Sequence, residues 1–233
     1  MPTQVVRLGT PVPRRRSKTP PMSTEESIAL QLSKEYGPIA VILHGSRAVE
    51  MNRLHSDWDV LLLFSEEPEL ALNREEIEGQ DVEWKAVKVP VAENAILSTI
   101  GVELQFGKVL WEDQSRAGTH LVEQAAAFYA KGVQVTEADR AKYKQYLCHK
   151  IAGMEDDIAT PYMFLRHQYT FFLRASNWWF EMNGQYPKPF YMAMPIIRER
   201  DPEYHDLLLT VSAAEPNETK IAAARRIISR LFA

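Results

Sequence analysis

Two runs of five consecutive apolar residues stand out in the first half of the chain. Short apolar runs of this kind, rich in β-branched and aliphatic side chains and closed by turn residues, are typical of buried β-strands. We therefore predict strands over residues 38–44 and 57–64, which contain the two runs. Residues 81–89 alternate polar and apolar positions, as a strand covered on one face does. Residues 108–111 predict a short last strand.

Helical patterns begin at Ser23 or Thr24, where a capping residue precedes two glutamates, and this first helix is predicted to end at Gly37. Residues 70–77 and 92–105 are also predicted to be helical. Beyond residue 112 the strand signals vanish, and helices are expected over 114–130, 136–158, 161–183, 189–199, 203–211 and 217–231. This order predicts an α+β fold with a small mixed-sheet domain over 23–112 and an all-α helical bundle over 113–233.

Nearly half of the aromatic residues fall between positions 162 and 191. Phe164, Phe171 and Trp178 recur every seven residues, which predicts one buried helix face and favours a core role over a stacking platform. The acidic cluster at 155–157 has two interpretations. It is either a solvated helix end, which we favour, or an acidic wall for a cationic substrate.

Composition and charge narrow the class of protein. The 233 residues are 45% hydrophobic and 25% charged, as in ordinary globular proteins. Cys148 is the single cysteine, so no internal disulfide can form, and a reducing, cytoplasmic compartment is expected. The apolar runs are far shorter than the ~20 residues that span a bilayer, so no membrane association is expected.

The charges are unevenly spread along the chain. Residues 1–22 carry five basic residues, five prolines and no acid, which predicts a flexible tail. The remainder is distinctly acidic because the chain as a whole has a net charge of −4. A nucleic-acid polymer is not expected as a partner, since such proteins usually present a basic face.

The candidate chemistry lies between Gly45 and Asp59. Asp57 and Asp59 stand two positions apart on a predicted strand, so both carboxylates point to one face, about 6–7 Å apart along the backbone. Two close carboxylates on an apolar strand repel each other unless they share a cation. Hard oxygen ligands in pairs suit Mg²⁺, which usually takes one or two carboxylates together with substrate phosphates.

The residues that precede this pair suit a phosphate group. Gly45, twelve positions before Asp57, allows the backbone to approach closely, Ser46 offers a hydroxyl, and Arg47 offers a planar cationic fork. Arg47 has an alternative, purely structural role as an ion-pair partner of Glu50. Ser56 has two equally weighted roles, one in nucleotide binding and one as a turn cap.

This pattern, Gly-Ser followed by Asp-x-Asp on a strand, resembles the polymerase-β-type nucleotidyltransferase superfamily. It is most similar to the small bacterial members, the minimal nucleotidyltransferases and the aminoglycoside and lincosamide nucleotidyltransferases. The resemblance implies that Asp57 and Asp59 bind Mg²⁺ and that a third acidic residue on a neighbouring strand completes the site or acts as base. Glu83 is the expected third carboxylate, and Asp81 on the same face is the competing candidate.

The resemblance further implies an enzyme that moves a nucleoside monophosphate, AMP from ATP or its counterpart from another nucleoside triphosphate, onto a small hydroxylated acceptor and releases pyrophosphate. Two alternatives stay open. The acceptor is a partner protein, as in antitoxin-like minimal nucleotidyltransferases, or the chain binds a nucleotide without turnover. The sequence identifies neither the acceptor nor the oligomeric state.

Overall fold

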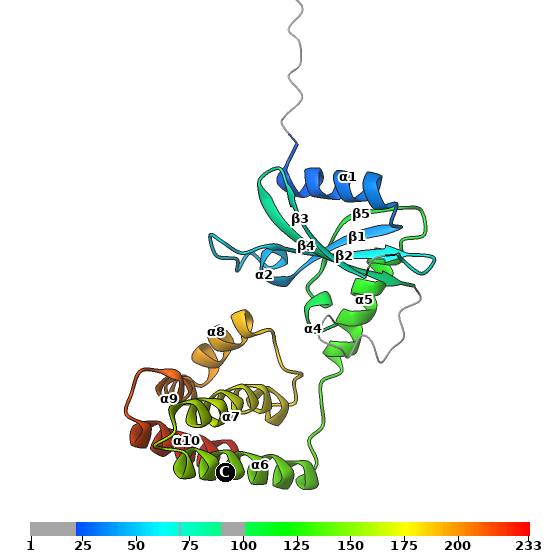
Figure 1. Ribbon diagram of the computed structural model, residues 1–233. Helices are drawn as coiled ribbons and strands as arrows, with labels where there is room; N and C mark the ends of the chain where they lie inside the picture. Colours follow the sequence, from blue (N-terminus) through cyan, green and yellow to red (C-terminus); the bar gives the residue numbers. More distant parts are fainter. Residues whose placement is uncertain (1–21, 70, 90–100) are drawn as a thin grey trace, which may run out of the picture.

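A computed structural model describes residues 22–69, 71–89 and 101–233. An α/β part with a mixed five-stranded sheet is followed along the chain by a helical part (Figure 1). This confirms the expected α+β fold class. The proline-rich basic segment 1–22 lies outside the described residues except for Met22.

The sheet contains β1 (Ala40–His44), β2 (Trp58–Phe64), β3 (Leu72–Ile77), β4 (Gln80–Lys88) and β5 (Lys108–Glu112). Its strand order is β3-β4-β2-β1-β5. β2 and β4 are parallel, and the other neighbouring pairs are antiparallel. The start of β2 therefore lies between the start of β4 and the end of β1.

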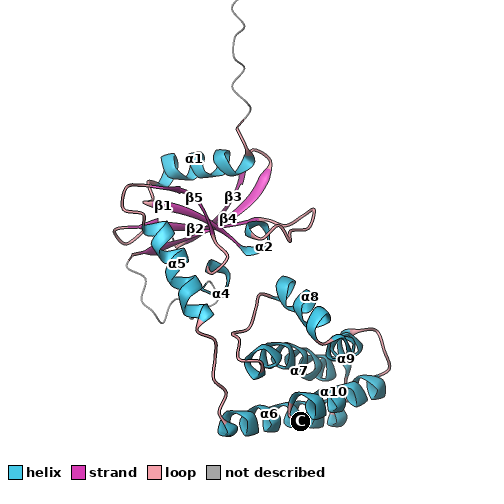
Figure 2. Cartoon of the chain, turned by 180° about the vertical axis from the view of Figure 1, so that it is seen from behind, coloured by secondary structure: helices cyan, strands magenta, loops and turns pink. Residues whose placement is uncertain are grey.

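Helices cover both faces of the sheet. α1 (Thr24–Tyr36) packs on one face, where its Ile28 and Leu32 join the core of β2 and β4. It begins with a capping box between Ser23 and Glu26 and ends at the left-handed Gly37. α4 (Gly101–Leu104) and α5 (Ala117–Ala130) cover the opposite face (Figure 2).

One predicted element has the wrong type. Residues 72–77 form strand β3 instead of a helix, and the short turn at Glu78 and Gly79, both with positive φ, joins it to β4. β3 is the edge strand, and of its residues only Ile77 is buried, so its sequence lacks the apolar alternation of a strand. Of the helix expected over 92–105, α4 is the described portion, and residues 90–100 lie outside the described residues.

The helical part consists of α6 (Glu137–Asp156), α7 (Pro161–Met182), α8 (Phe190–Arg200), α9 (Pro202–Ser212) and α10 (Asn217–Leu231). The aromatic repeat of α7 forms its core, because Phe164, Phe171 and Trp178 are all buried. The core interpretation of this repeat is confirmed, although Leu165, directly after Phe164, is 57% exposed.

α5 belongs by its packing to the α/β part. Leu121, Ala125 and Tyr129 of this helix pack against the sheet, whereas the core of the helical part begins with α6. The packing therefore differs from the expected division at residue 112 for this one helix. Residues 131–136 then connect the two parts.

The acidic cluster at 155–157 is engaged in local ion pairs. Glu155 pairs with Arg225, and Asp157 lies 3.3 Å from Nε2 of His167. Both views show α6 on the side of the helical part away from the sheet. These observations favour the solvated helix end over an acidic wall.

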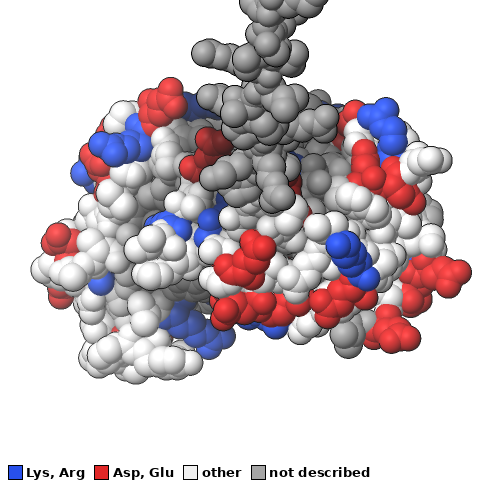
Figure 3. Space-filling model, turned by 90° about the horizontal axis from the view of Figure 1, so that it is seen from above, with Lys and Arg blue, Asp and Glu red and all other residues white. Residues whose placement is uncertain are grey.

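Two observations concern the charge of the surface and the hydropathy of the helices. In the face shown in Figure 3, the described residues form no continuous basic surface, and acidic and basic side chains are intermixed. No helix among the described ranges is long and apolar enough to cross a membrane.

Candidate active site

A row of polar side chains crosses four strands of the sheet. Asp59 on β2 is in register with His44 on β1 and with Glu83 on β4, and Glu83 is in register with Arg74 on β3. We call these four residues the polar row. Residues in register share a face of the sheet, and Asp59 shares its face with Leu61, which packs in the core beneath α5. The row therefore lies on the α4 and α5 face, where the apolar core of that face ends.

Asp59 is the most perturbed carboxyl group of the row. Burial raises the pKa of Asp59 to about 6, against the opposing effect of His44, and the charges of Asp57, Glu103 and Glu83 add to the increase. Negative charge is therefore in excess around Asp59. A strongly perturbed carboxyl group surrounded by further carboxylates is typical of functional sites.

Gly45 brings the chain after β1 directly against Asp59. Its φ of +71° is in the left-handed region, and a Cβ atom at this position would lie 2.2 Å from Oδ2 of Asp59. Both the conformation and the close approach require glycine here. The glycine of the predicted motif therefore fixes where the Asp59 carboxylate lies.

His44 and Glu103 form a pair that the sequence did not predict. His44 is 3% exposed, and its Nδ1 lies 2.8 Å from Oε2 of Glu103 on α4. The contact fixes one edge of the imidazole in the row beside Asp59. The position of His44 at the end of an otherwise apolar strand could have indicated a functional role. Its partner could not be predicted, because Glu103 is 59 residues away along the chain.

The two candidates for the third carboxylate have different surroundings. Glu83 lies directly beside Asp59 in the register, and its Oε1 is 3.6 Å from Lys85. The two carboxylate oxygens of Asp81 accept hydrogen bonds from Nε and Nη2 of Arg74 at 2.7 and 2.5 Å, and this hydrogen bonding lowers the pKa of Asp81. The same guanidinium lies 3.4 Å from Asp57. Asp81 is held by two hydrogen bonds from Arg74, whereas Glu83 has only the longer contact with Lys85 and lies in register with Asp59, and this difference favours Glu83.

Arg47 and Ser56 take part in holding the loop before β2. Arg47 donates from Nε and Nη2 to the carbonyl oxygen of Ser56 and from Nε to that of Asp57, and its guanidinium lies 4.5 Å from the centre of the Trp58 ring. The hydroxyl of Ser56 accepts from the backbone N–H of Arg53 at 2.8 Å. The contact of Ser56 is that of a turn cap, and the contacts of Arg47 hold the backbone of Asp57. Nucleotide contacts by these two side chains stay a prediction.

Ser46 follows Gly45 in the short helix α2 (Gly45–Ala48) and is half-buried beside the row. Its carbonyl oxygen accepts from the backbone N–H of Met51 at 2.9 Å, which closes this loop on itself. Among the described residues the Ser46 hydroxyl has no hydrogen-bond partner.

The helical part reaches toward the row through the start of α8. Burial raises the pKa of Tyr191, and the charges of Glu103 and Asp59 add to this effect, so the phenol lies within electrostatic range of both carboxylates. Lys188 donates to the side-chain oxygen of Gln105 on the sheet side at 3.1 Å. An aromatic hydroxyl of the helical part is therefore near the site, and a cation of the helical part contacts the segment that follows α4.

The side chains fit a divalent cation only together with ligands from a substrate. No group of three or more histidine, cysteine, aspartate or glutamate side chains that could hold a metal ion occurs in the described part of the chain. Asp57, Asp59 and Glu83 supply hard carboxylate oxygens, and the pKa of Asp59 is raised first by burial and then by the charges of neighbouring carboxylates, which a bound cation would offset. Mg²⁺ needs few protein ligands when phosphate oxygens supply the others.

Comparisons with known proteins add little to this picture. No protein-family model matches the sequence, and no curated protein sequence matches it. Among solved structures the chain is similar to the crystal structure of a nucleotidyltransferase-like protein from Exiguobacterium sibiricum 255-15, with 14% sequence identity and a TM-score of 0.46 over 90% of this chain and 74% of that chain. At this identity and TM-score the likeness carries no functional conclusion, so the chemistry has to be inferred from the residues themselves.

Proposed function

We propose that the protein is a Mg²⁺-dependent nucleotidyltransferase that moves a nucleoside monophosphate from a nucleoside triphosphate, ATP in the first instance, onto a hydroxyl group. The observation that carries the proposal is the register of Asp59 beside Glu83, with the left-handed Gly45 packed against the Asp59 carboxylate. A structural role for two adjacent carboxylates is disfavoured, because their repulsion and burial destabilise the fold unless a cation is shared.

Each residue has a role that follows from its position. Asp57 and Asp59 would hold the metal ion against the triphosphate, and Ser46 at the Gly45 loop would contact the outer phosphates. Bound Mg²⁺ would stabilise negative charge on the attacking and leaving oxygens. Arg47 keeps the backbone of Asp57 in place through the carbonyl contacts described above.

The proposed transfer is an in-line displacement at the α-phosphorus. The acceptor oxygen forms a bond to the α-phosphorus, the bond from the α-phosphorus to the bridging oxygen breaks, and pyrophosphate leaves. Glu83 completes the metal site or takes the proton of the acceptor hydroxyl and returns it to solvent.

The acceptor is a small hydroxylated molecule in this proposal. Tyr191 of the helical part lies within electrostatic range of the row, Lys188 contacts Gln105 directly after α4, and the acidic cluster at 155–157 lies at the end of α6, away from the sheet. An aromatic ring and a cation disfavour a polycationic acceptor. This favours lincosamide-like over aminoglycoside-like molecules.

The direct experiment is a pyrophosphate-release assay with Mg²⁺, each of the common nucleoside triphosphates and a panel of both acceptor classes. We expect release that depends on Mg²⁺ and on a small acceptor. If α-labelled ATP labels a protein in lysate instead, the protein is still a nucleotidyltransferase, but its acceptor is a partner protein and not a small molecule. Nucleotide binding without turnover under all conditions would favour a binding protein and contradict the proposal.

Glu83→Gln and Asp81→Asn separate the two candidates for the third carboxylate. We expect Glu83→Gln to lower kcat roughly 100-fold or more, because it removes a charge beside Asp59 that acts in the transition state. Asp81→Asn is expected to stay within about tenfold of wild type, because it loses only an exposed ion pair with Arg74. The reverse order of the two effects would assign the role to Asp81.

A further inference from the structure

A second site candidate lies in the helical part, where five helices meet around a cavity of about 300 Å³. Its lining includes three arginines, Arg140 of α6, Arg200 of α8 and Arg230 of α10, and one acidic residue, Asp201. Trp179 of α7, Asn183 at the C-cap of α7 and Tyr204 of α9 also line it. Three arginines and one acidic residue therefore line this cavity in a chain with a net charge of −4.

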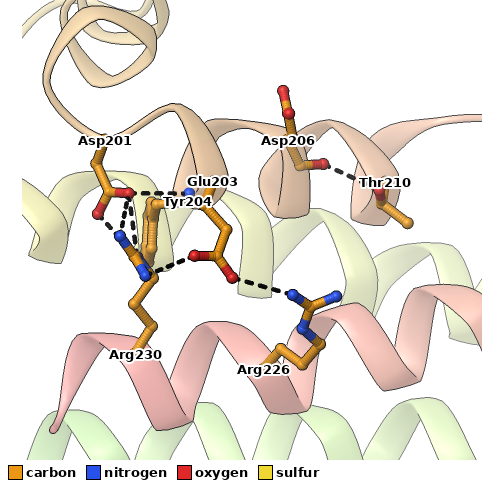
Figure 4. A network of polar contacts seen from close by, with 7 residues as sticks. All are labelled: Asp201, Glu203, Tyr204, Asp206, Thr210, Arg226 and Arg230. Atoms are coloured by element: carbon orange, nitrogen blue, oxygen red, sulfur yellow. Dashed lines mark hydrogen bonds and ion pairs between the residues drawn. The ribbon is translucent and has the colours of Figure 1, made fainter.

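The carboxylate of the cavity is already used within the protein. Asp201 accepts from Nε and Nη2 of Arg230 at 2.7–3.0 Å and from the backbone N–H of Tyr204 at 3.1 Å (Figure 4). Glu203 continues this network by accepting from Arg230 and Arg226 at 2.8 and 3.0 Å. Within the network two acidic residues balance two arginines, so it offers no spare carboxylate to the rest of the cavity.

Arg200 and Arg140 are the least compensated charges of the lining. Arg200 is exposed and forms no ion pair among the described residues. Lys188 has its pKa lowered by burial and, in addition, by the charge of Arg200, so the electrostatic neighbour of Arg200 is another cation. Nε of Arg140 lies 3.8 Å from Glu137, whose side chain is 94% exposed. Such a solvated pair neutralises little charge.

Helix termini explain only part of this arrangement. Arg200 and Arg230 stand in the last turns of α8 and α10, where a cation is favourable for the helix dipole. Arg140, in contrast, lies three residues after the start of α6, where a cation is unfavourable. The helix dipole therefore does not account for Arg140, and its partner within the chain, Glu137, is largely solvated.

We propose that this cavity binds a small phosphate-bearing molecule, with Arg140 and Arg200 as its main contacts and Arg230 as a fixed wall. Guanidinium groups that converge from different helices suit a tetrahedral dianion with several oxygens better than one planar carboxylate. The volume is at the lower end for ligand sites, which suits a phosphate or diphosphate group with a small substituent. The proposal does not depend on the proposed nucleotidyl transfer.

Isothermal titration calorimetry with inorganic phosphate and pyrophosphate tests this site, in buffer with a chelator so that no metal bridges phosphate to Asp59. The test variant is Arg140→Gln/Arg200→Gln. The matched control is Arg166→Gln/Arg174→Gln, which removes the same charge from two exposed positions of α7 outside the cavity lining. Arg230 is left in place because it holds Asp201 and Glu203. Circular dichroism checks that both variants are folded.

We expect saturable binding of one phosphate or pyrophosphate per chain in wild type, at least tenfold weaker in Arg140→Gln/Arg200→Gln and unchanged in the control. No saturable binding to wild type would overturn the proposal. An equal loss in both double variants would also overturn it, because it would show general attraction to positive charge. Stronger binding of citrate than of pyrophosphate would contradict the assignment to phosphate.

Discussion

Asp59→Asn is expected to abolish most activity and, at the same time, to stabilise the fold. Nucleotidyl transfer should fall by roughly 10³-fold, since the substitution removes a charged oxygen that acts on the metal and the triphosphate. The stability change has the opposite sign because the Asp59 carboxylate is partly buried beside other carboxylates. If the carboxylate stabilised the fold, its replacement would make the protein less stable. Activity and stability measured together therefore distinguish a functional role of Asp59 from a structural one.

The stability effect has a defined pH dependence. The pKa of Asp59 is about 6 in the folded protein, against 3.8 as its ordinary value. The folded state therefore binds this proton more tightly, and wild-type stability is lost as the pH rises from about 4 to 6. The asparagine side chain does not titrate. The free energy of unfolding of Asp59→Asn, relative to that of wild type, should therefore be on the order of 1–2 kcal/mol larger at pH 8 than at pH 4, after allowance for solvent screening.

Urea unfolding at the two pH values, in metal-free buffer, measures this difference. Added Mg²⁺ with nucleotide is expected to stabilise wild type and to leave Asp59→Asn nearly unchanged. A variant that is less stable than wild type at pH 8 would contradict the assignment of Asp59 as a functional carboxylate. So would equal stabilisation of both proteins by Mg²⁺ and nucleotide.

Gly45→Ala is expected to have the second largest effect, on stability and activity together. The added methyl group would meet Oδ2 of Asp59 at 2.2 Å, and the residue would have to keep a φ of +71°. We expect a loss of roughly 2–4 kcal/mol in the free energy of unfolding from the combined strain and overlap. Displacement of the Asp59 carboxylate should also reduce transfer by about 100-fold or more.

Gly79→Ala is the matched control for this substitution. Gly79 also has a positive φ, +77°, but nothing lies within 4 Å of a Cβ atom there. It should lose only the backbone contribution, about 1 kcal/mol, and keep full activity because it lies in the β3–β4 turn. Equal losses in the two alanine variants would mean that the contact between Gly45 and Asp59 is unimportant.

Local sequence patterns were sufficient for most of the fold. The apolar runs predicted β1 and β2, and the capping residues Ser23 and Thr136 predicted where α1 and α6 begin. β3 was predicted wrongly because its arginine and glutamates are good helix formers and its position at the sheet edge buries only Ile77. Its strand conformation depends on pairing with β4, which is a tertiary effect.

The candidate site likewise contains residues that local sequence patterns predicted and residues that only the fold brings together. Gly45, Asp57 and Asp59 stand close together in the sequence, so their chemistry was predictable from spacing. The Glu103 partner of His44 and the Arg74 partner of Asp81 come from other elements, and only the folded sheet brings them together. Arg47 was expected to bind phosphate, but its hydrogen bonds go to backbone carbonyls of the loop before β2, which no local pattern indicates.

In the proposed mechanism, Asp57, Asp59 and Glu83 support attack at the α-phosphorus. Parallel reactions with ATP labelled at the α- or the γ-phosphate, followed by analysis of the modified acceptor, test this most directly. We expect the α-label in the acceptor, the γ-label in pyrophosphate, and at most a trace of either product with Asp59→Asn. The γ-label in the acceptor, or full transfer of the α-label by Asp59→Asn, would contradict the proposed mechanism.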